Sequence, residues 1–338
     1  MNYLLLTIIS IIIFYLISKI SKKFNLLDYP DNRKIHNEPT PYVGGFAISI
    51  LYLIIIYFSN FVSEFYNNIL VYGFVISLFG LIDDKYKIGI GSKLVLQLMP
   101  IIFMIHSANI YLENLGEYEL IGFVELGSFS LVFSVLCIFL LINSINYIDG
   151  LDGLASIVFL SSCLSFLFFS HFEHKELNIF IFSLIIPVII FLFFNFNLFY
   201  LPKLFLGNSG SNLLGFLLSF ISIFVYKKYN IHPALIVWSL AFPVYEFLST
   251  NILRIWSNRE IFKPGHDHLH YEINQKIKNK YLTNIIILLI IIFYSCFGYF
   301  IFSFFNSLTS IITFIISFFI YFFLRKMLTV KKVIFTKE

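Results

Sequence analysis

Carboxylate and amide side chains gather in residues 143–155, NSINYIDGLDGLA, a segment between two apolar runs. Asp149 and Asp152 are each followed by glycine, so two carboxylates lie on one side of a tight turn or a helix end. Asn143 and Asn146 add amide groups just before them. Such oxygen donors suit a hard cation or a sugar, and carboxylates near hydrocarbon usually face a wet cavity, a partner or a substrate. The alternative is a polar loop that caps the following helix.

A second pair of carboxylates, Asp83 and Asp84, comes at the end of another apolar run. Lys93 and Gln97 follow shortly afterwards, one helical turn apart. Adjacent carboxylates repel each other, so at least one of them requires a cation or a proton as its partner. A divalent ion would supply that partner, and so would a neighbouring lysine in a solvated loop.

Glycines flank two short polar side chains in FLGNSGS, residues 205–211, where Asn208 and Ser209 open a further apolar run. Backbone N–H groups at a helix N-terminus bind anions, so this segment is a candidate phosphate site. The alternative is a simple N-cap formed by Asn208 or Ser209.

The first polar loop, residues 28–45, combines three prolines with the pair Gly44-Gly45 and a basic cluster of Arg33, Lys34 and His36. The prolines forbid a continuous helix, and the paired glycines let the backbone approach a neighbouring segment or a phosphate. The basic cluster is a candidate substrate-binding group. A topology signal beside anionic lipid explains Arg33 and Lys34 equally well.

The longest polar loop begins at Arg254 and carries His268 and His270 at alternate positions. Alternate positions share a face in an extended segment but not on a helix. Phosphate contact by the imidazoles and Arg254 fits this basic loop better than zinc binding, because no cysteine or closed ligand set is near. Glu246, about two turns inside the preceding apolar run, is expected to pair with one of these cations or to close the floor of a site.

The elements that must position these loops are membrane helices. Of the 338 residues, 59% are hydrophobic and 12% charged, which is typical of an all-α polytopic membrane protein and excludes an ordinary soluble domain. A small β-hairpin is predicted in the alternating segment 110–128, and a single membrane domain over residues 1–338. Eleven apolar runs are candidate spans: residues 2–20, 43–62, 67–82, 93–109, 129–145, 153–170, 177–195, 208–226, 232–253, 282–304 and 307–325.

The positive-inside rule orients these runs. With Met1 outside, all but three of the 23 Lys and Arg residues fall in the inner segments; the exceptions are Lys175, Lys227 and Lys228. The polar loops described above are then all cytoplasmic, as is the C-terminus. The hairpin lies on the outer side.

Taken together, the inner loops resemble those of the polyprenyl-phosphate N-acetylhexosamine-1-phosphate transferase family (glycosyltransferase family 4). The resemblance covers most of the chain, with the loops in the same order and on the same side. Eleven spans are more similar to the bacterial N-acetylglucosamine-1-phosphate branch than to the ten-span peptidoglycan translocase branch. The motifs that carry the resemblance fall on Asp28, Pro30, Arg33, Lys34, His36, Pro41, Gly44-Gly45, Asp83-Asp84, Lys93 and residues 143–155.

The resemblance implies transfer of a HexNAc-1-phosphate group from a UDP-N-acetylhexosamine to undecaprenyl or another polyprenyl phosphate, with release of UMP. It further implies Mg²⁺, with Mn²⁺ as an alternative, and the bacterial inner membrane as the location. This step would initiate a cell-envelope polysaccharide. No nucleic acid is expected as a partner, and a homodimer is left open. So are the sugar (GlcNAc, GalNAc, QuiNAc or FucNAc) and the choice between a one-step and a covalent route.

Residue roles follow from the same resemblance. Asp149, Asp152 and Asn208 correspond to the metal and diphosphate region, and Asp83 and Asp84 lie beside the acceptor phosphate. A general base is not essential there, because a phosphate monoester has a second pKa of about 6. His268 and His270, together with Arg254, would hold the leaving diphosphate, and Phe205 resembles a uracil-stacking aromatic. The substrate-binding residues implied are Arg33, Lys34, His36, Lys93, Asn143, Asn146, Phe205, Ser209 and Arg254.

Three positions depart from the family pattern. Asn208 stands where a metal-ligating Asp is usual; its carbonyl brings no charge and is expected to bind Mg²⁺ more weakly. Tyr271 follows His270 where a third His is usual, with Gly265 in place of an Asp, and Glu246 also replaces an Asp. Two other classes therefore stand beside the enzyme: a weakly active relative that binds UDP-sugar or lipid, and a secondary transporter with an intramembrane ion path.

Overall fold

A computed structural model describes residues 2–30, 38–58, 61, 63–260, 265 and 267–335, with side chains as far as Met327. The basic cluster Arg33, Lys34 and His36 lies outside the described residues. Helices in chain order are α1 (Tyr3–Lys23), α2 (Gly44–Phe58), α3 (Glu64–Tyr86), α4 (Ile90–Ala108), α5 (Ser130–Ile148), α6 (Leu154–Phe169), α7 (Lys175–Asn195), α8 (Gly207–Tyr229), α9 (Pro233–Ser239), α10 (Ala241–Trp256), α11 (Leu269–Ile277), α12 (Lys280–Phe304) and α13 (Ser307–Phe335).

Each of the eleven predicted apolar runs contains helix. Across the described residues, eight helices are long and apolar enough to cross a membrane. The pair α9–α10 would make a ninth span, bent by 74°. The helices α2 and α6 have only 15 and 16 residues, so at 1.5 Å per residue each is about 23 Å long, shorter than the hydrocarbon core. The part of the chain that the structure describes therefore has eight or nine candidate full spans and two shorter apolar helices.

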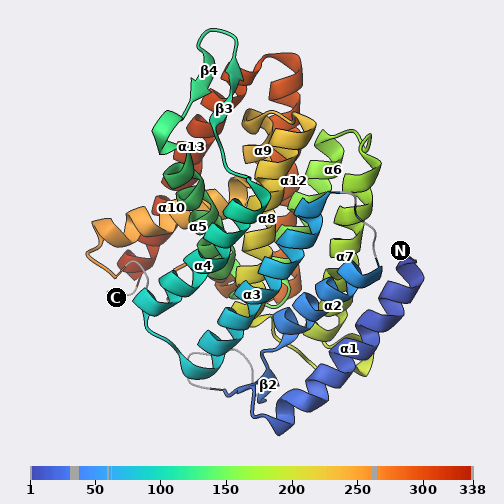
Figure 1. Cartoon of the computed structure of the whole chain (residues 1–338). Helices are drawn as coiled ribbons and strands as arrows, with labels where there is room; N and C mark the ends of the chain where they lie inside the picture. The colour runs from blue at the N-terminus through green and yellow to red at the C-terminus, as the bar shows by residue number, and fades with distance from the viewer. Residues whose placement is uncertain are drawn as a thin grey trace.

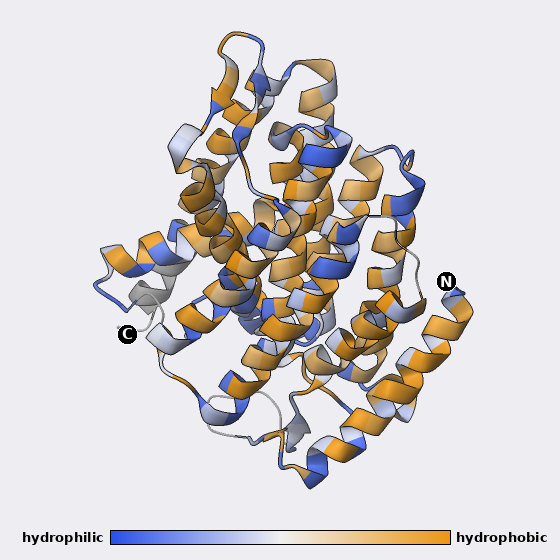
Figure 2. Ribbon diagram, in the orientation of Figure 1, coloured by the Kyte–Doolittle hydropathy of each residue, from blue (hydrophilic) through white to orange (hydrophobic). Residues whose placement is uncertain are grey.

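Most residues of the helices are hydrophobic, and many of the hydrophilic residues lie toward the loops and helix ends (Figure 2). This distribution is that of a multi-pass membrane protein, whose lipid-facing helices have no need of a polar outer stripe. Capping residues fix several helix ends. Asn279 accepts hydrogen bonds from the N–H groups of Tyr281 and Leu282 at the start of α12, and left-handed Asn109 and Asn230 end α4 and α8.

Two small antiparallel sheets lie at opposite ends of the helix bundle (Figure 1). The predicted hairpin is confirmed as β3 (Asn114–Tyr118) paired with β4 (Gly122–Glu125). The second sheet, β1 (Leu27–Asp28) with β2 (Thr40–Pro41), was not predicted, because two-residue strands leave no periodic pattern.

The long helix α8 runs through the middle of the bundle (Figure 1), where it packs against α2, α3 and α5. Glycines permit these close approaches. A Cβ on Gly45 of α2 would lie 2.0 Å from Cα of Gly210, and one on Gly80 of α3 would lie 2.5 Å from the carbonyl oxygen of Asn208. Small residues at these crossings hold the start of α8 against α2 and α3.

Glu119, between β3 and β4, caps the last helix. Its carboxylate accepts hydrogen bonds from the N–H of Ser307 at 3.0 Å, the hydroxyl of Ser307 at 2.9 Å and the N–H of Leu308 at 3.3 Å. Hydrogen bonds from its own backbone and then from these α13 groups lower the pKa of Glu119 to about 2. The hairpin is thereby tied to the N-terminus of α13.

We expect Glu119→Gln to lower the melting temperature at neutral pH. A lowered carboxyl pKa contributes stability that is fully present above the usual value of 4.5 and is lost as the pH falls toward 2. The gap in melting temperature between wild type and variant, measured in detergent from pH 7 to pH 3, should therefore be constant above about pH 5 and narrow below it. A gap that widens in acid would contradict the capping role.

Candidate active site

The N-terminus of α8 is capped by a carboxylate from another helix. Asp84, near the end of α3, accepts the backbone N–H groups of Asn208 at 3.1 Å and Ser209 at 3.3 Å. Gly207 makes this approach possible, since its φ is +72° and a Cβ there would lie 2.7 Å from Asp84 Oδ2. The anion-binding N–H groups predicted in this segment are thus present, and Asp84 itself occupies them.

The side chain of Asn208 joins three helices. Its Nδ2 donates to Asp83 Oδ2 at 3.0 Å, and its Oδ1 accepts a hydrogen bond from Asn146 Nδ2 of α5 at 2.7 Å. Asp83 also pairs with Lys93 Nζ of α4 at 3.0 Å. A neighbouring lysine was one of the two partners predicted for the paired carboxylates. Four of the predicted site residues therefore meet in one hydrogen-bonded cluster.

Asp152 is held by two lysines. Its Oδ2 lies 3.0 Å from Lys203 Nζ, in the loop before α8, and 2.6 Å from Lys280 Nζ, in the first turn of α12. Sequence reasoning gave neither lysine a role. A signal existed for Lys280, because a cation at a helix N-terminus is electrostatically unfavourable and requires a compensating group. Here that group is Asp152.

Asp149, at the C-terminal end of α5, has neither a cation nor a hydrogen-bond donor as partner among the described residues. Burial, and then the negative charges of Asp84 and Asp152, raise the pKa of its carboxyl well above the ordinary value. Asp83 and Asp152 have lysine partners and Asp84 has two backbone N–H groups. Asp149 is therefore the carboxylate whose charge is left uncompensated.

The two predicted histidines lie beside this acidic cluster. His268 is extended and precedes α11, whereas His270 lies in its first turn, so the pair does not share one extended segment. Their rings nevertheless stack, with centroids 5.5 Å apart. His270 Nε2 would lie 2.5 Å from a Cβ on Gly150, which places His270 against the residue that follows Asp149.

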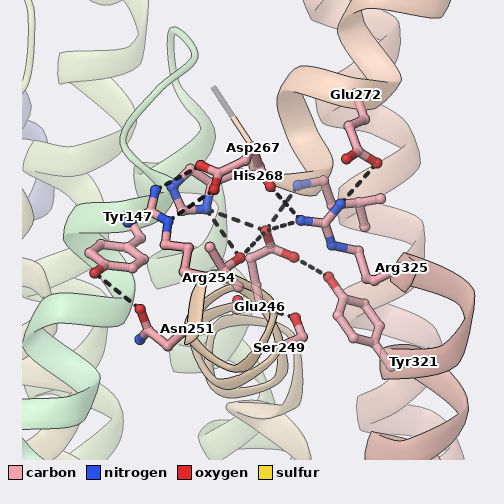
Figure 3. Close-up of polar contacts among 12 residues, drawn as sticks. Tyr147, Glu246, Ser249, Asn251, Arg254, Asp267, His268, Glu272, Tyr321 and Arg325 are labelled. Carbon is pink, nitrogen blue, oxygen red and sulfur yellow. Dashed lines mark hydrogen bonds and ion pairs between the residues drawn. The ribbon is translucent and has the colours of Figure 1, made fainter. Parts of the chain in front are cut away.

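Arg254, at the end of α10, holds the start of the histidine segment. Its guanidinium donates to both carboxylate oxygens of Asp267, at 2.9 and 2.7 Å, and lies over the ring of Tyr147 at 5.5 Å (Figure 3). Glu246 pairs with Arg325 of α13, a cation outside the loop that begins at Arg254, and its Oε1 also lies 3.4 Å from His268 Nδ1 of that loop. The sequence assigns Arg325 no role beyond its positive charge in the inner C-terminal segment.

The remaining candidates have mixed surroundings. Asn143 is buried and donates to the carbonyl of Phe139 at 2.8 Å, one turn back on α5. Ser209 is buried and donates to the carbonyl of Leu206 at 3.3 Å. The half-buried ring of Phe205 lies 4.9 Å from Lys203 Nζ, beside the lysines on Asp152. Substrate contact by these residues stays a prediction.

The donor set around Asp149 fits Mg²⁺. Carboxylate and amide oxygens are its preferred protein ligands, and the uncompensated carboxylate is near enough to Asp84 for that negative charge to raise its pKa. Among the described residues no three His, Cys, Asp or Glu side chains converge as a closed metal cage. A Mg²⁺ site in proteins commonly uses one or two carboxylates together with water and substrate phosphate. The alternative, a polar loop that only caps a helix, gives no reason for a half-buried carboxylate whose charge has no positive partner among the described residues.

Comparison with known proteins identifies the family of the chain. Residues 66–226 match the model of glycosyl transferase family 4. A probable undecaprenyl-phosphate N-acetylglucosaminyl 1-phosphate transferase of Bacillus subtilis is 31% identical over 273 residues, which are 80% of this chain and 75% of that protein. The chain belongs to this family of polyprenyl-phosphate N-acetylhexosamine-1-phosphate transferases.

Other family members are similar over comparable lengths. The undecaprenyl-phosphate alpha-N-acetylglucosaminyl 1-phosphate transferase of Haemophilus influenzae is 27% identical over 73% of this chain and 71% of its own length. The protein of the same name from Escherichia coli O157:H7 is 25% identical, over 75% and 71%. The chain is thus a multi-pass membrane member of a phospho-N-acetylhexosamine transferase family.

Proposed function

We propose that this transferase moves a HexNAc-1-phosphate group from a UDP-N-acetylhexosamine to undecaprenyl phosphate. An oxygen of the lipid phosphate bonds to the β-phosphorus, the bridging oxygen–phosphorus bond breaks, and UMP leaves with the electron pair. The observation that carries the proposal is the uncompensated carboxylate of Asp149 between a lysine-bound Asp152 and a buried histidine pair. Its family relatives, named for undecaprenyl phosphate and N-acetylglucosaminyl 1-phosphate, support the donor and the acceptor.

Each part of the site has a task in this reaction. Asp149 and Asp84 would hold Mg²⁺, and Asn208 and Asp152 would lie at the edge of the metal site. When bound, the ion neutralises charge on the diphosphate. Lys203 and Lys280 bring two positive charges to one carboxylate, so together they leave one positive charge for an anionic substrate.

We propose that Asp83 and Asp84 position the acceptor phosphate indirectly. They hold two positive groups in place, the Lys93 ammonium and the N-terminus of α8. Lys93 bonds Asp83, and the N-terminus of α8 bonds Asp84, so both carboxylates are fixed at the end of α3. Positioning and electrostatic compensation are the main contributions a protein makes to phosphoryl transfer.

We also propose that the chain crosses the bacterial inner membrane eleven times, with α2 and α6 as short crossings and α9–α10 as a bent one. The distribution of Lys and Arg supports a site that faces the cytoplasm, where the nucleotide is available. The lipid would reach the same site sideways from the bilayer. GlcNAc is the first sugar to test, because the relatives are named for it.

UMP-dependent exchange separates this enzyme from both alternatives. Purified protein in detergent is incubated with labelled UMP, unlabelled UDP-GlcNAc and undecaprenyl phosphate, and labelled UDP-GlcNAc is measured. We expect exchange that requires the lipid; exchange without lipid would favour a covalent aspartyl-phosphate route. A transporter would give none, and a weak relative would bind UDP-GlcNAc without exchange.

A further inference from the structure

The last helix places a fully buried cation behind the histidine segment. Arg325 of α13 is 1% exposed, although the run FFIYFFLRK around it is otherwise apolar up to Lys326. We propose that Arg325 is a positioning residue that holds His268 and His270 at the transfer site. The inference rests on the proposed function, and it adds to it a residue far from the acidic motifs in sequence.

The guanidinium of Arg325 reaches three acceptors on three segments (Figure 3). Its Nη2 donates to the carbonyl oxygen of Asp267 at 2.6 Å and lies 3.3 Å from Glu246 Oε1 of α10. Its Nη1 lies 2.9 Å from Glu272 Oε2 of α11. Asp267 and Glu272 are the first and last residues of the segment that carries both histidines.

Glu246 holds the same segment from the other side. Its Oε1 accepts the backbone N–H of Leu269 at 2.9 Å and lies 3.4 Å from His268 Nδ1. Its Oε2 accepts a short hydrogen bond from the hydroxyl of Tyr321, one turn before Arg325 on α13. Glu246 and Arg325 are thus a pair whose remaining contacts converge on Asp267–Glu272.

Stability alone does not account for this arrangement. Desolvation of two buried charges offsets most of their attraction, and well-packed apolar side chains commonly serve as well or better. Charges within a membrane-spanning segment are costlier still. What the ion pair supplies is geometry, because the planar fork of Arg can bond several acceptors at once whereas a lysine ammonium on a shorter stem cannot.

The geometry is transmitted to the acidic cluster. The rings of His268 and His270 stack, and His270 lies against Gly150, next to Asp149. A small displacement of Asp267–Glu272 would therefore shift an imidazole relative to the bound diphosphate. Misplacement by about 1 Å can cost on the order of 10²-fold in rate.

The test compares Arg325→Lys with Lys326→Arg, a matched control at the next residue of α13, which is exposed and lies over the ring of Trp256. We expect Arg325→Lys to lower kcat for UMP exchange by about 10- to 100-fold with little change in KM for UDP-GlcNAc, and Lys326→Arg to leave both unchanged. In a His270→Asn background, Arg325→Lys should cost no more than about twofold, because its effect passes through the histidines.

A second readout does not depend on activity. We expect diethyl pyrocarbonate, followed by mass spectrometry, to modify His268 and His270 severalfold faster in Arg325→Lys, with exposed His106 as the unchanged reference. Glu272→Gln, which removes one of the three Arg325 contacts, should act in the same direction but less, and serves if Arg325→Lys does not fold.

The inference would be overturned if Arg325→Lys caused equal losses of activity in the wild-type and His270→Asn backgrounds and left the labelling of both histidines unchanged. Exchange by the wild type would still support the proposed function in that case. No exchange by the wild type would instead remove the proposed function. Even then, faster labelling in Arg325→Lys would still support the positioning of the histidine segment.

Discussion

Asp149→Asn is expected to raise the melting temperature of the metal-free protein while lowering transfer on the order of 10²- to 10³-fold. Burial and the neighbouring carboxylates raise the pKa of Asp149, so the folded state binds its proton more tightly than the unfolded state does. The free energy of unfolding therefore falls as the pH rises above about 3.8, the ordinary value. Asparagine removes that penalty, and it removes the charge that would bind Mg²⁺.

Melting temperatures in EDTA and in Mg²⁺ measure this directly. Mg²⁺ at one hundred times its Kd would stabilise the wild type by about 2.7 kcal/mol, and Asp149→Asn should lose most of that gain. Asp152→Asn is the matched control with the opposite sign, because it leaves two lysines without their carboxylate and should lower the melting temperature in EDTA. If Asp149→Asn were less stable than the wild type in EDTA at pH 7, the charge of Asp149 would not be uncompensated.

Asn208→Asp is expected to destabilise the metal-free protein by about 1–3 kcal/mol. The amide donates to Asp83 Oδ2 at 3.0 Å, and a carboxylate in its place would set two negative oxygens against each other. The hydrogen bond from Asn146 would remain, because either side chain can accept it. The added charge should also tighten Mg²⁺ binding, so the variant is expected to reach half-maximal activity at a lower Mg²⁺ concentration than the wild type.

Asn208→Ala separates the two effects of this substitution. It loses the hydrogen bond to Asp83 without gaining charge, so it should be destabilised in EDTA and show no tighter Mg²⁺ response. Melting curves and a Mg²⁺ titration of transfer activity, measured on the wild type, Asn208→Asp and Asn208→Ala, separate the effect of the lost hydrogen bond from that of the added charge. If Asn208→Asp were as stable as the wild type in EDTA and required more Mg²⁺, Asn208 would not border the metal site.

The helical frame and most of the acidic cluster could be predicted from sequence, because apolar run length and loop motifs are local features. Asp83, Asp84, Asn146 and Asn208 were singled out separately, and the structure brings them together. Apart from a lysine partner for the paired carboxylates, which Lys93 supplies, their contacts were not predicted. Asp84 caps α8 from another helix, which the simple N-cap alternative did not anticipate, since that alternative considered only residues of the same segment.

Long-range partners were the main omission. Lys203, Lys280 and Arg325 lie 51, 128 and 79 residues from the carboxylates that they contact, and no periodic pattern links such positions. The helices α2 and α6, with 15 and 16 residues, are also shorter than the apolar runs 43–62 and 153–170 that predicted them. Sequence hydropathy measures which residues tolerate lipid and does not measure where a helix ends.

The most direct measurement is forward transfer of labelled sugar phosphate from UDP-GlcNAc to undecaprenyl phosphate by the purified protein in detergent, with Asp149→Asn prepared in parallel. The expected result is a lipid-linked, labelled GlcNAc-diphosphate made by the wild type in Mg²⁺, released UMP in equal amount, and almost none of either from the variant. If the wild type bound UDP-sugar yet formed no labelled lipid from any of the four UDP-N-acetylhexosamines, or if Asp149→Asn were fully active, the assignment of this site would be wrong.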